Sequence, residues 1–252
     1  MEALENGAID YIQKPSYEAL DQTAPLIIEK IKIASQVKLK RRNPEVTVAR
    51  RLDAKAFDFH TVIAMGSSTG GTEALKEILI RLPESIPPIV IVQHIPAVFS
   101  LAFAKRMNEL CPFEVKEAED GDEVISNRVL IAPGGRQMKL DAKTGNLKVT
   151  INDGAPVNRH KPSVDVLFDS AAEILGGNAL GVILTGMGTD GARGMLKMKN
   201  AGARTVAQDE ASCVVFGMPR EAIRMGGAME VKPLLEIPEL LVRWLSTKKR
   251  AA

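Results

Sequence analysis

From residue 59 onward, short runs of continuously apolar, β-branched residues alternate with stretches of helical periodicity. Such runs are typical of strands buried on both faces of a parallel sheet, with the intervening helices covering those faces. We therefore predict an α/β fold with a doubly wound, mostly parallel sheet and helices on both faces, a Rossmann-like three-layer arrangement. The predicted strands are 61–65, 88–93, 128–132, 147–153, 180–185 and 204–208, and the predicted helices are 72–82, 100–110, 163–175, 191–202 and 218–225.

The first part of the chain has a different pattern. Residues 1–35 are expected to contain the end of a helix, one strand at 8–13, a Lys-Pro turn and a second helix, which is too little to bury a core. Residues 36–58 are charged, include Pro44 and show no periodicity, as is typical of a linker. We expect a domain remnant over 1–35, a linker over 36–58 and a complete domain over 59–250.

Composition and charge argue against several classes of protein. The N-terminus has no basic segment followed by an apolar one, and no apolar run reaches the roughly 18 residues of a membrane span. Cys111 and Cys213 are too few for a metal cluster or a disulfide framework, and Cys213 is expected to pack rather than to react. We therefore expect a cytoplasmic protein without membrane insertion. The net charge of +2 indicates no particular partner, and the basic run at 38–42 is interpreted as a solvated linker rather than a nucleic-acid site, because no aromatic residues interleave with it.

Polar side chains follow three of the predicted strands at the point where each strand ends. Ser68 follows the first strand within GSSTGG, His94 follows the second, and Asp190 lies in GMGTDGA after 180–185. Because the carboxyl ends of parallel strands meet at one edge of a sheet, we expect these three side chains to lie together. They are the nucleophile, the base and the orienting carboxylate of a Ser-His-Asp hydrolase, which requires no metal and no organic cofactor.

The residues alone leave alternatives open. Ser67 neighbours Ser68, and position does not separate the two as nucleophile. His160, in NRHKPSVD, could act as the base, although it precedes a helix rather than ending a strand. GSSTGG could be the phosphate-binding turn of a dinucleotide fold, but its spacing is not GxGxxG and no acid ends the second strand. A dinucleotide-binding oxidoreductase and a non-catalytic binding module therefore remain rivals to a hydrolase.

Longer stretches of the sequence point to a family. GSSTGGTEAL, IVQHIP, VKEAEDGD, IAPGG, DGAPVNRHKPSVDVLF, GVILTGMGTDGARGM and AQDEASCVVFGMPREAI closely resemble the catalytic domain of the CheB family of protein-glutamate methylesterases. The resemblance runs from residue 59 to residue 232. It implies that Ser68, before Thr-Gly-Gly, is the nucleophile, that His94 is the base and that Asp190 is the third member of the triad. It also implies that the backbone of Met187, and that of Thr69, forms the oxyanion neighbourhood.

The same resemblance implies a substrate. The expected substrate is methylated glutamate on the helical cytoplasmic domains of methyl-accepting chemoreceptors, hydrolysed to glutamate and methanol in chemotactic adaptation. Deamidation of receptor glutamines is the expected second activity, because it is the same acyl chemistry with ammonia as the leaving group.

The N-terminal segment GAIDYIQKPS resembles the last strand and turn of a response-regulator receiver domain, with Lys14 as its signature lysine and Tyr11 as its switch aromatic. The family architecture implies regulation by aspartyl phosphorylation from a kinase phosphorelay. Only thirteen residues precede Lys14 in this sequence, and Asp10 lies within the last strand, where it cannot serve as the phosphate acceptor. We therefore expect esterase activity that does not respond to acetyl phosphate with magnesium.

Overall fold

The computed structural model describes residues 8–9, 11–12, 14–15, 20–36, 52, 61–143 and 145–247. The chain divides into two compact units, Met1–Val48 and Ala49–Ala252. The interpretation of residues 1–35 as a domain remnant stays a prediction, and the expected linker at 36–58 falls almost wholly outside the described residues.

The described part of the first unit contains one helix, α2 (Leu20–Gln36). The described residues of the expected strand at 8–13 belong to no strand, so that prediction is wrong at those positions. Strands are stabilised by pairing with a neighbour, and the described residues of this unit contain no second strand. The carbonyl of Tyr11 instead accepts a hydrogen bond from Lys30 Nζ at 3.0 Å, and the Lys30 ammonium lies 5.0 Å from the centroid of the Tyr11 ring.

The second unit is built on a seven-stranded sheet with the strand order β3-β4-β2-β1-β7-β8-β9. Every adjacent pair in it is parallel, and strands are added on both sides of β1, which confirms the predicted doubly wound α/β fold. The strands are β1 (Val62–Ser67), β2 (Ile89–Gln93), β3 (Glu114–Glu117), β4 (Arg128–Ile131), β7 (Ala179–Ile183), β8 (Arg204–Gln208) and β9 (Glu230–Lys232).

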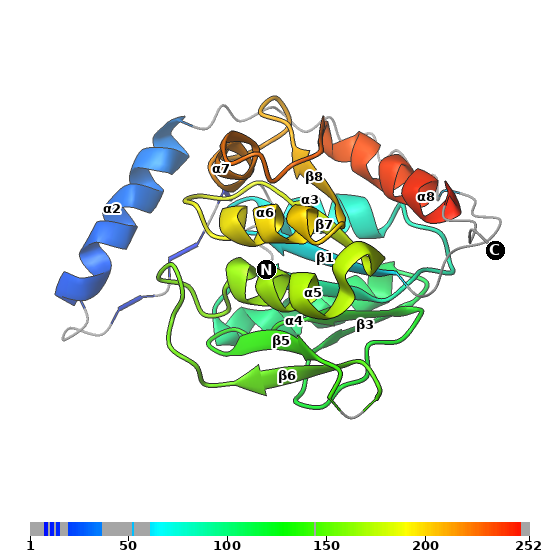
Figure 1. Cartoon of the computed structure of the whole chain (residues 1–252). Coiled ribbons are helices and arrows are strands. Elements are labelled where there is room, and N and C mark those ends of the chain that lie inside the picture. Colours follow the sequence, from blue (N-terminus) through cyan, green and yellow to red (C-terminus); the bar gives the residue numbers. More distant parts are fainter. Residues whose placement is uncertain are drawn as a thin grey trace. The chain divides into compact units, whose positions relative to one another are not determined.

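Helices cover both faces of this sheet. Helices α5, α6 and α7 pack on one face and α3, α4 and α8 on the other, while the antiparallel hairpin of β5 and β6 packs against α5 (Figure 1). These elements are α3 (Gly71–Leu79), α4 (Ala97–Leu110), β5 (Gln137–Asp141), β6 (Lys148–Asn152), α5 (Val164–Leu175), α6 (Ala192–Asn200), α7 (Met218–Arg224) and α8 (Ile237–Thr247), with short 3₁₀ turns η1 (Gly176–Asn178) and η2 (Leu234–Glu236).

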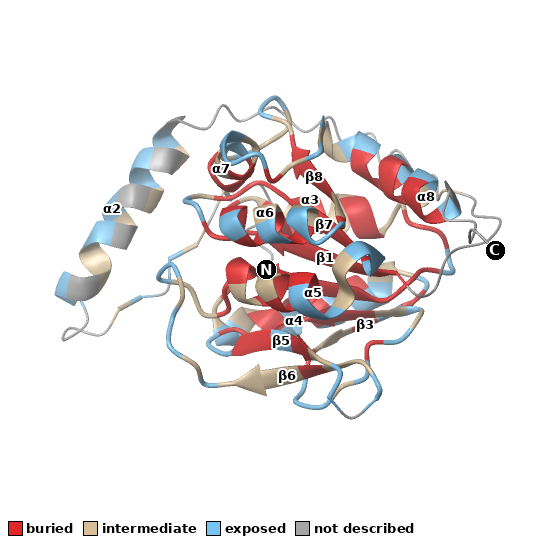
Figure 2. Cartoon of the chain, in the orientation of Figure 1, coloured by how far each residue is buried: buried red, intermediate tan, exposed pale blue. Residues whose placement is uncertain are grey.

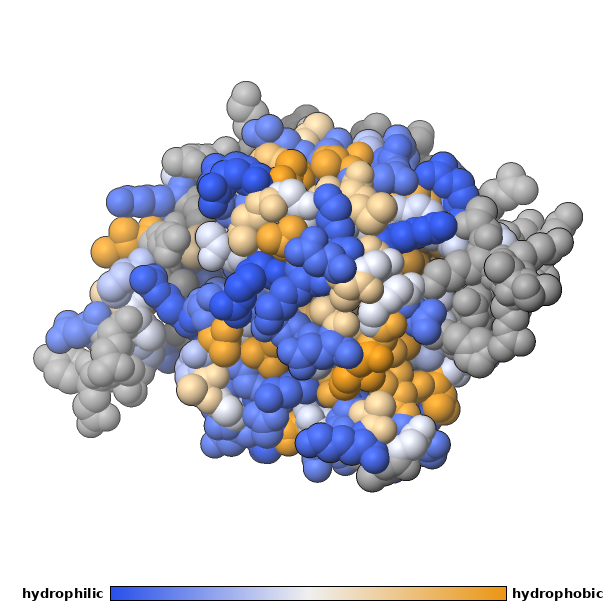
Figure 3. Space-filling view, viewed as in Figure 1, coloured by the Kyte–Doolittle hydropathy of each residue, from blue (hydrophilic) through white to orange (hydrophobic). Residues whose placement is uncertain are grey.

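The three central strands are buried along their whole length. Every residue of β1, β2 and β7 is buried (Figure 2), which is why these strands are continuous apolar runs in the sequence. On the face seen in Figure 3, apolar side chains lie in separate patches among hydrophilic ones. None of the helices in the described ranges is long and apolar enough to cross a membrane.

The structure departs from the sequence prediction outside these buried strands. The strand predicted at 147–153 exists as β6, but it pairs with β5 in the hairpin and not in the main sheet. Helix α4 begins at Ala97 rather than at residue 100, because Pro96 precedes it with φ −63° and its ring presets the turn that starts a helix. Strands β3, β5 and β9 are missing from the sequence prediction, since they are short and only partly buried. Helix α8 is missing as well, although its buried residues recur at helical spacing.

Strand register brings the ends of β1, β2 and β7 to the same place. Ser67 pairs with Gln93 across β1 and β2, and Gly66 pairs with Ile183 across β1 and β7. The residues directly after these three strands therefore emerge together at the carboxyl edge of the sheet, where ligands bind in open α/β sheets.

Candidate active site

Ser68 lies in the tight turn between β1 and α3. Its N–H donates to the carbonyl of Thr185 at 3.0 Å, and its own carbonyl accepts from the N–H of Gly71 at 2.7 Å, which begins α3. Gly70, between them, has φ +77°, a conformation that side-chain-bearing residues rarely adopt. The backbone of Gly186 passes close by, because a Cβ placed there would lie 2.7 Å from the Cβ of Ser68. The turn holds the half-buried Ser68 between the ends of β1 and β7.

The neighbouring Ser67 is in a different environment. It is fully buried, and its Oγ donates to Oε1 of Gln93 at 2.5 Å. The amide nitrogen of Gln93 donates in turn to the carbonyl of Ser68 at 2.8 Å and to that of His94 at 3.2 Å. Ser67 therefore has a structural hydroxyl, while Ser68 is the serine that is partly accessible at the sheet edge.

His94 and Asp190 are in direct contact. Nε2 of His94 lies 2.8 Å from Oδ2 of Asp190, and their side chains are 8% and 0% exposed. The N–H of His94 donates to the carbonyl of Ser67 at 3.0 Å, which keeps the histidine beside the serine turn. Because Nε2 faces a carboxylate, it carries the proton of the neutral imidazole, and the lone pair is left on Nδ1. The pair is thus a base with a defined tautomer.

The carboxylate of Asp190 accepts hydrogen bonds from several donors at the start of α5. Ser163 Oγ and the N–H of Val164 donate at 2.7 Å, and Nδ2 of Asn158 donates at 2.7 Å. Burial by itself raises the pKa of a carboxyl group, but the hydrogen bonds that Asp190 accepts from His94, Asn158 and Ser163 outweigh this effect. The pKa of Asp190 therefore lies well below its ordinary value, and the group is a permanent anion at neutral pH.

His160, the alternative base, also lies at this edge of the sheet, but it contacts the His94 ring rather than the Asp190 carboxylate. Its ring stacks on that of His94, with the ring centroids 3.6 Å apart and the planes 9° from parallel. The hydrogen bond with the carboxylate belongs to His94. The structure therefore brings Ser68, His94, Asp190 and His160 together at one edge.

The backbone near Met187 contains a hydrogen-bond donor that can stabilise a negative charge. Gly186 is held by its carbonyl, which accepts from the N–H groups of Gly217 and Met218 at 3.1 and 2.8 Å. The N–H of Met187 donates to no other described residue, so it is available to a ligand. Thr69, the second expected contributor, is buried, and its carbonyl accepts from Thr185 Oγ1 at 3.0 Å.

Several residues of this edge had no role in the sequence interpretation. Gln93, Asn158, Ser163 and Thr185 make hydrogen bonds to the serine turn or to Asp190. The available signal is weak: Ser163 is the first residue of the helix predicted at 163–175, and a serine at the start of a helix normally indicates an N-cap. In the structure its hydroxyl binds the carboxylate of Asp190 instead.

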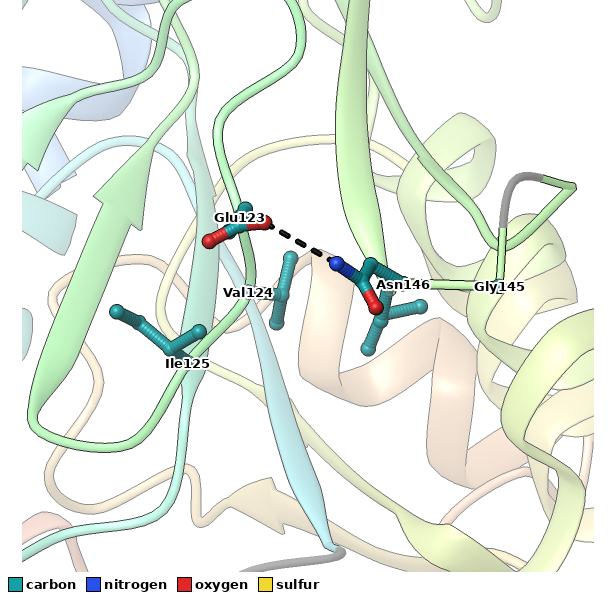
Figure 4. A pocket seen from close by; sticks show the side chains of 6 residues that line it. Glu123, Val124, Ile125, Gly145 and Asn146 are labelled. Carbon is teal, nitrogen blue, oxygen red and sulfur yellow. Dashed lines mark hydrogen bonds between the residues drawn. The ribbon is translucent and has the colours of Figure 1, made fainter.

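Three other possible sites, namely the Cys213 thiol, a metal site and a surface hollow, lack the groups that a reaction would need. Burial raises the pKa of the Cys213 thiol to about 12, so this cysteine is not a nucleophile at neutral pH. Among the described residues, no group of three or more His, Cys, Asp or Glu side chains could hold a metal ion. An open hollow of about 320 Å³ lies beside Glu123 and Asn146, but their side chains point at each other and hydrogen-bond at 3.3 Å (Figure 4).

Comparison with known proteins gives a consistent result. The family model described as CheB methylesterase matches residues 63–241. A protein of Salmonella choleraesuis named protein-glutamate methylesterase/protein-glutamine glutaminase is 48% identical over 249 residues, 98% of this chain and 71% of that protein. One of the same name from Bordetella parapertussis is 49% identical over 253 residues, 98% of this chain and 72% of that protein.

A solved structure agrees with these relatives. The crystal structure of the Thermotoga maritima CheB methylesterase catalytic domain superposes with a TM-score of 0.71 at 42% identity. It covers 73% of this chain and 98% of its own. The chain belongs to the CheB methylesterase family.

Proposed function

We propose that this chain hydrolyses glutamate methyl esters of proteins, with Ser68 as nucleophile, His94 as general base and Asp190 as the carboxylate that orients the base. Its activity is that of a protein-glutamate methylesterase/protein-glutamine glutaminase, as its relatives are named. The observation that carries the residue assignment is the buried pair of His94 and Asp190, 2.8 Å apart, beside the serine turn.

The reaction proceeds through an acyl-enzyme. Nδ1 of His94 accepts the proton of Ser68 as Oγ attacks the ester carbonyl, and Asp190 stabilises the imidazolium that forms. The N–H of Met187 donates to the oxyanion as a preorganised dipole. His94 then returns the proton to the departing methoxide, which leaves as methanol.

The second half of the reaction uses the same groups. His94 takes a proton from a water molecule, which attacks the acyl carbon, and the bond to Ser68 Oγ breaks to give the free glutamate and the restored serine. With a glutamine side chain, ammonia leaves in place of methanol. No step needs a metal or an organic cofactor, since the charge that develops is matched by backbone N–H groups and by Asp190.

The physiological substrate that fits the family is methylated glutamate on the cytoplasmic helices of chemoreceptors. An acyl group on an exposed helix side chain can reach Ser68, because that residue is partly accessible at the open edge of the sheet. The family membership supports this substrate class.

The test is methanol release from a methylated receptor fragment. Ser68→Ala is expected to lower kcat by about 10⁴-fold or more, because the remaining hydroxyl of Ser67 is committed to Gln93. Ser67→Ala is the matched control, and its kcat should fall far less, although the loss of a buried hydrogen bond should lower stability by about 1–3 kcal/mol. Equal losses in the two variants, or a larger loss in Ser67→Ala, would contradict the assignment.

A further inference from the structure

One short segment, Val157–His160, contacts both members of the catalytic pair. Asn158 donates to Asp190, and His160 stacks on His94. The segment lies in the loop between β6 and α5 and belongs to neither strand nor helix. A single backbone turn therefore supplies contacts both to the Asp190 carboxylate and to the His94 ring.

The amide of Asn158 stands between two buried carboxylates. Its Nδ2 donates to Oδ1 of Asp190 at 2.7 Å and to Oδ2 of Asp165 at 2.7 Å. Asp190 is 0% exposed, and the side chain of Asp165 is 3% exposed. Two carboxylates this close in a buried site repel each other unless donors separate them. An uncharged group with two N–H donors fits this position, and each of its hydrogens faces one carboxylate.

The ring of His160 covers one face of the His94 ring. At a centroid distance of 3.6 Å and an angle of 9°, the two rings are in full face-to-face contact. Such contact blocks rotation of the His94 ring about its Cβ–Cγ bond. The ring plane decides where Nδ1 points once Nε2 is bound to Asp190, and proton transfer from Ser68 depends on that direction.

The segment is itself held in a fixed conformation. The N–H of His160 donates to the carbonyl of Val157 at 2.8 Å, and the N–H of Val157 donates to the carbonyl of His160 at 3.0 Å. Asn158 and Arg159 adopt φ +51° and +68°, in the left-handed region that non-glycine residues rarely occupy. Strained conformations of this kind persist where the surrounding contacts require them, and they are common at active sites.

We propose that Asn158 and His160 are positioning residues of the esterase. Asn158 holds the Asp190 carboxylate in place and separates it from Asp165, and His160 sets the plane of the His94 ring and therefore the direction in which Nδ1 points. The proposal rests on the proposed function of the triad. Neither residue touches the reacting atoms, so both act on kcat rather than on substrate binding.

Variants of Asn158 distinguish the effect of its two N–H donors from the effect of its side-chain volume. Asn158→Ala is expected to lower kcat by about 10²-fold with little change in KM. Asn158→Asp keeps the size but removes both donors and adds a third carboxylate, so its kcat should fall further. If Asn158→Asp has the activity of the wild type, or if Asn158→Ala stays within about 2-fold of it, the role of Asn158 is refuted. Asn178→Ala, in the exposed turn η1, is the matched control and should leave kcat unchanged.

Variants of His160 separate stacking from proton transfer. His160→Phe retains a flat ring without a titrating group and should keep kcat within about 3-fold of the wild type, whereas His160→Ala should lose about 10-fold or more. Equal losses in His160→Phe and His160→Ala would show that His160 acts through its nitrogen atoms, which would overturn the proposal. The double variant Asn158→Ala with His160→Ala should lose less than the product of the single losses, because both residues act on one pair.

A measurement without substrate distinguishes the failure of this proposal from failure of the proposed function. The sequence contains three histidines, so the imidazole resonances of labelled protein are few. His160→Ala should shift the ring protons of His94 by removing the ring current of the stacked imidazole, and unchanged shifts would refute the stacking. A wild-type protein that releases no methanol would refute the proposed function. An active wild type whose Asn158 and His160 variants are equally active would refute the positioning role alone.

Discussion

At the scale of the residue, two adjacent serines, Ser67 and Ser68, have different environments and different roles. Ser67 is the last residue of β1, and its hydroxyl is buried against Gln93. Ser68 is the first residue of the turn, where it contacts Thr185 and is partly accessible. The difference arises because β1, which is buried on both faces, ends at Ser67, whereas Ser68 lies in the turn at the edge of the sheet.

Asp190 connects catalysis to acid stability. Its folded pKa lies below the unfolded value of about 3.9, so its contribution to the free energy of unfolding is present above that value and is lost as the pH falls through the folded pKa. Asp190→Asn should therefore be less stable than the wild type at pH 7, and the difference should shrink as the pH is lowered below about 4. Urea unfolding at a series of pH values measures this difference.

A matched variant tests whether this behaviour is specific to Asp190. Asp153→Asn removes an exposed carboxylate that pairs with Lys161 at the surface, where solvent weakens the interaction, so its stability should change with pH far less than that of Asp190→Asn. A stability difference for Asp190→Asn that is constant between pH 7 and pH 2 would contradict the linkage. The same variant should lose roughly 10⁴-fold in kcat, because an amide favours the wrong tautomer of His94.

At the scale of the element, the site depends on how closely the chain after β7 approaches the serine turn. A Cβ at Gly186 would lie 2.7 Å from the Cβ of Ser68 and 2.3 Å from Sδ of Met218. The Met218 side chain is flexible, but the Cβ of Ser68 and its backbone nitrogen, 3.0 Å away, cannot move without displacing the nucleophile, so the segment needs a glycine there.

Gly186→Ala is accordingly expected to lower kcat by about 10²-fold and to reduce stability by about 1–3 kcal/mol through overpacking. Gly177→Ala is the matched control, since its Cβ would have its nearest contact at 3.5 Å from the carbonyl of Gly202, an ordinary distance. Methanol release and thermal unfolding of the two variants give the comparison. Wild-type activity in Gly186→Ala would mean that the serine turn tolerates displacement.

At the scale of the whole molecule, every residue assigned to the site belongs to the unit Ala49–Ala252. The Thermotoga maritima catalytic domain that superposes on this chain covers 73% of it, which indicates a fold that is complete without the first unit. A variant that lacks residues 1–48 should therefore fold and keep kcat within about 2-fold of the intact chain. Cooperative unfolding together with methanol release checks this, and a folded variant without activity would show that the first unit contributes to the site.

The sequence by itself determined the fold class and the identity of the three residues proposed for catalysis. Strands at the centre of the sheet are buried on both faces and must be apolar throughout, so β1, β2 and β7 are visible in the sequence. The residues directly after each of these strands are then constrained to one edge of the sheet. The short edge strand β9 is not visible in this way, because its residues are partly exposed and their pattern has no clear period.

Only the tertiary structure decided how the proposed triad is supported. The contact of Asn158 with Asp190, and the stacking of His160 on His94, join segments that are far apart in the sequence. No periodicity or spacing encodes such contacts, because they depend on the path of the loop before α5 relative to the ends of two strands. The chemistry of a residue type is local, whereas the direction in which its reactive atom points is set by the packing of the whole domain.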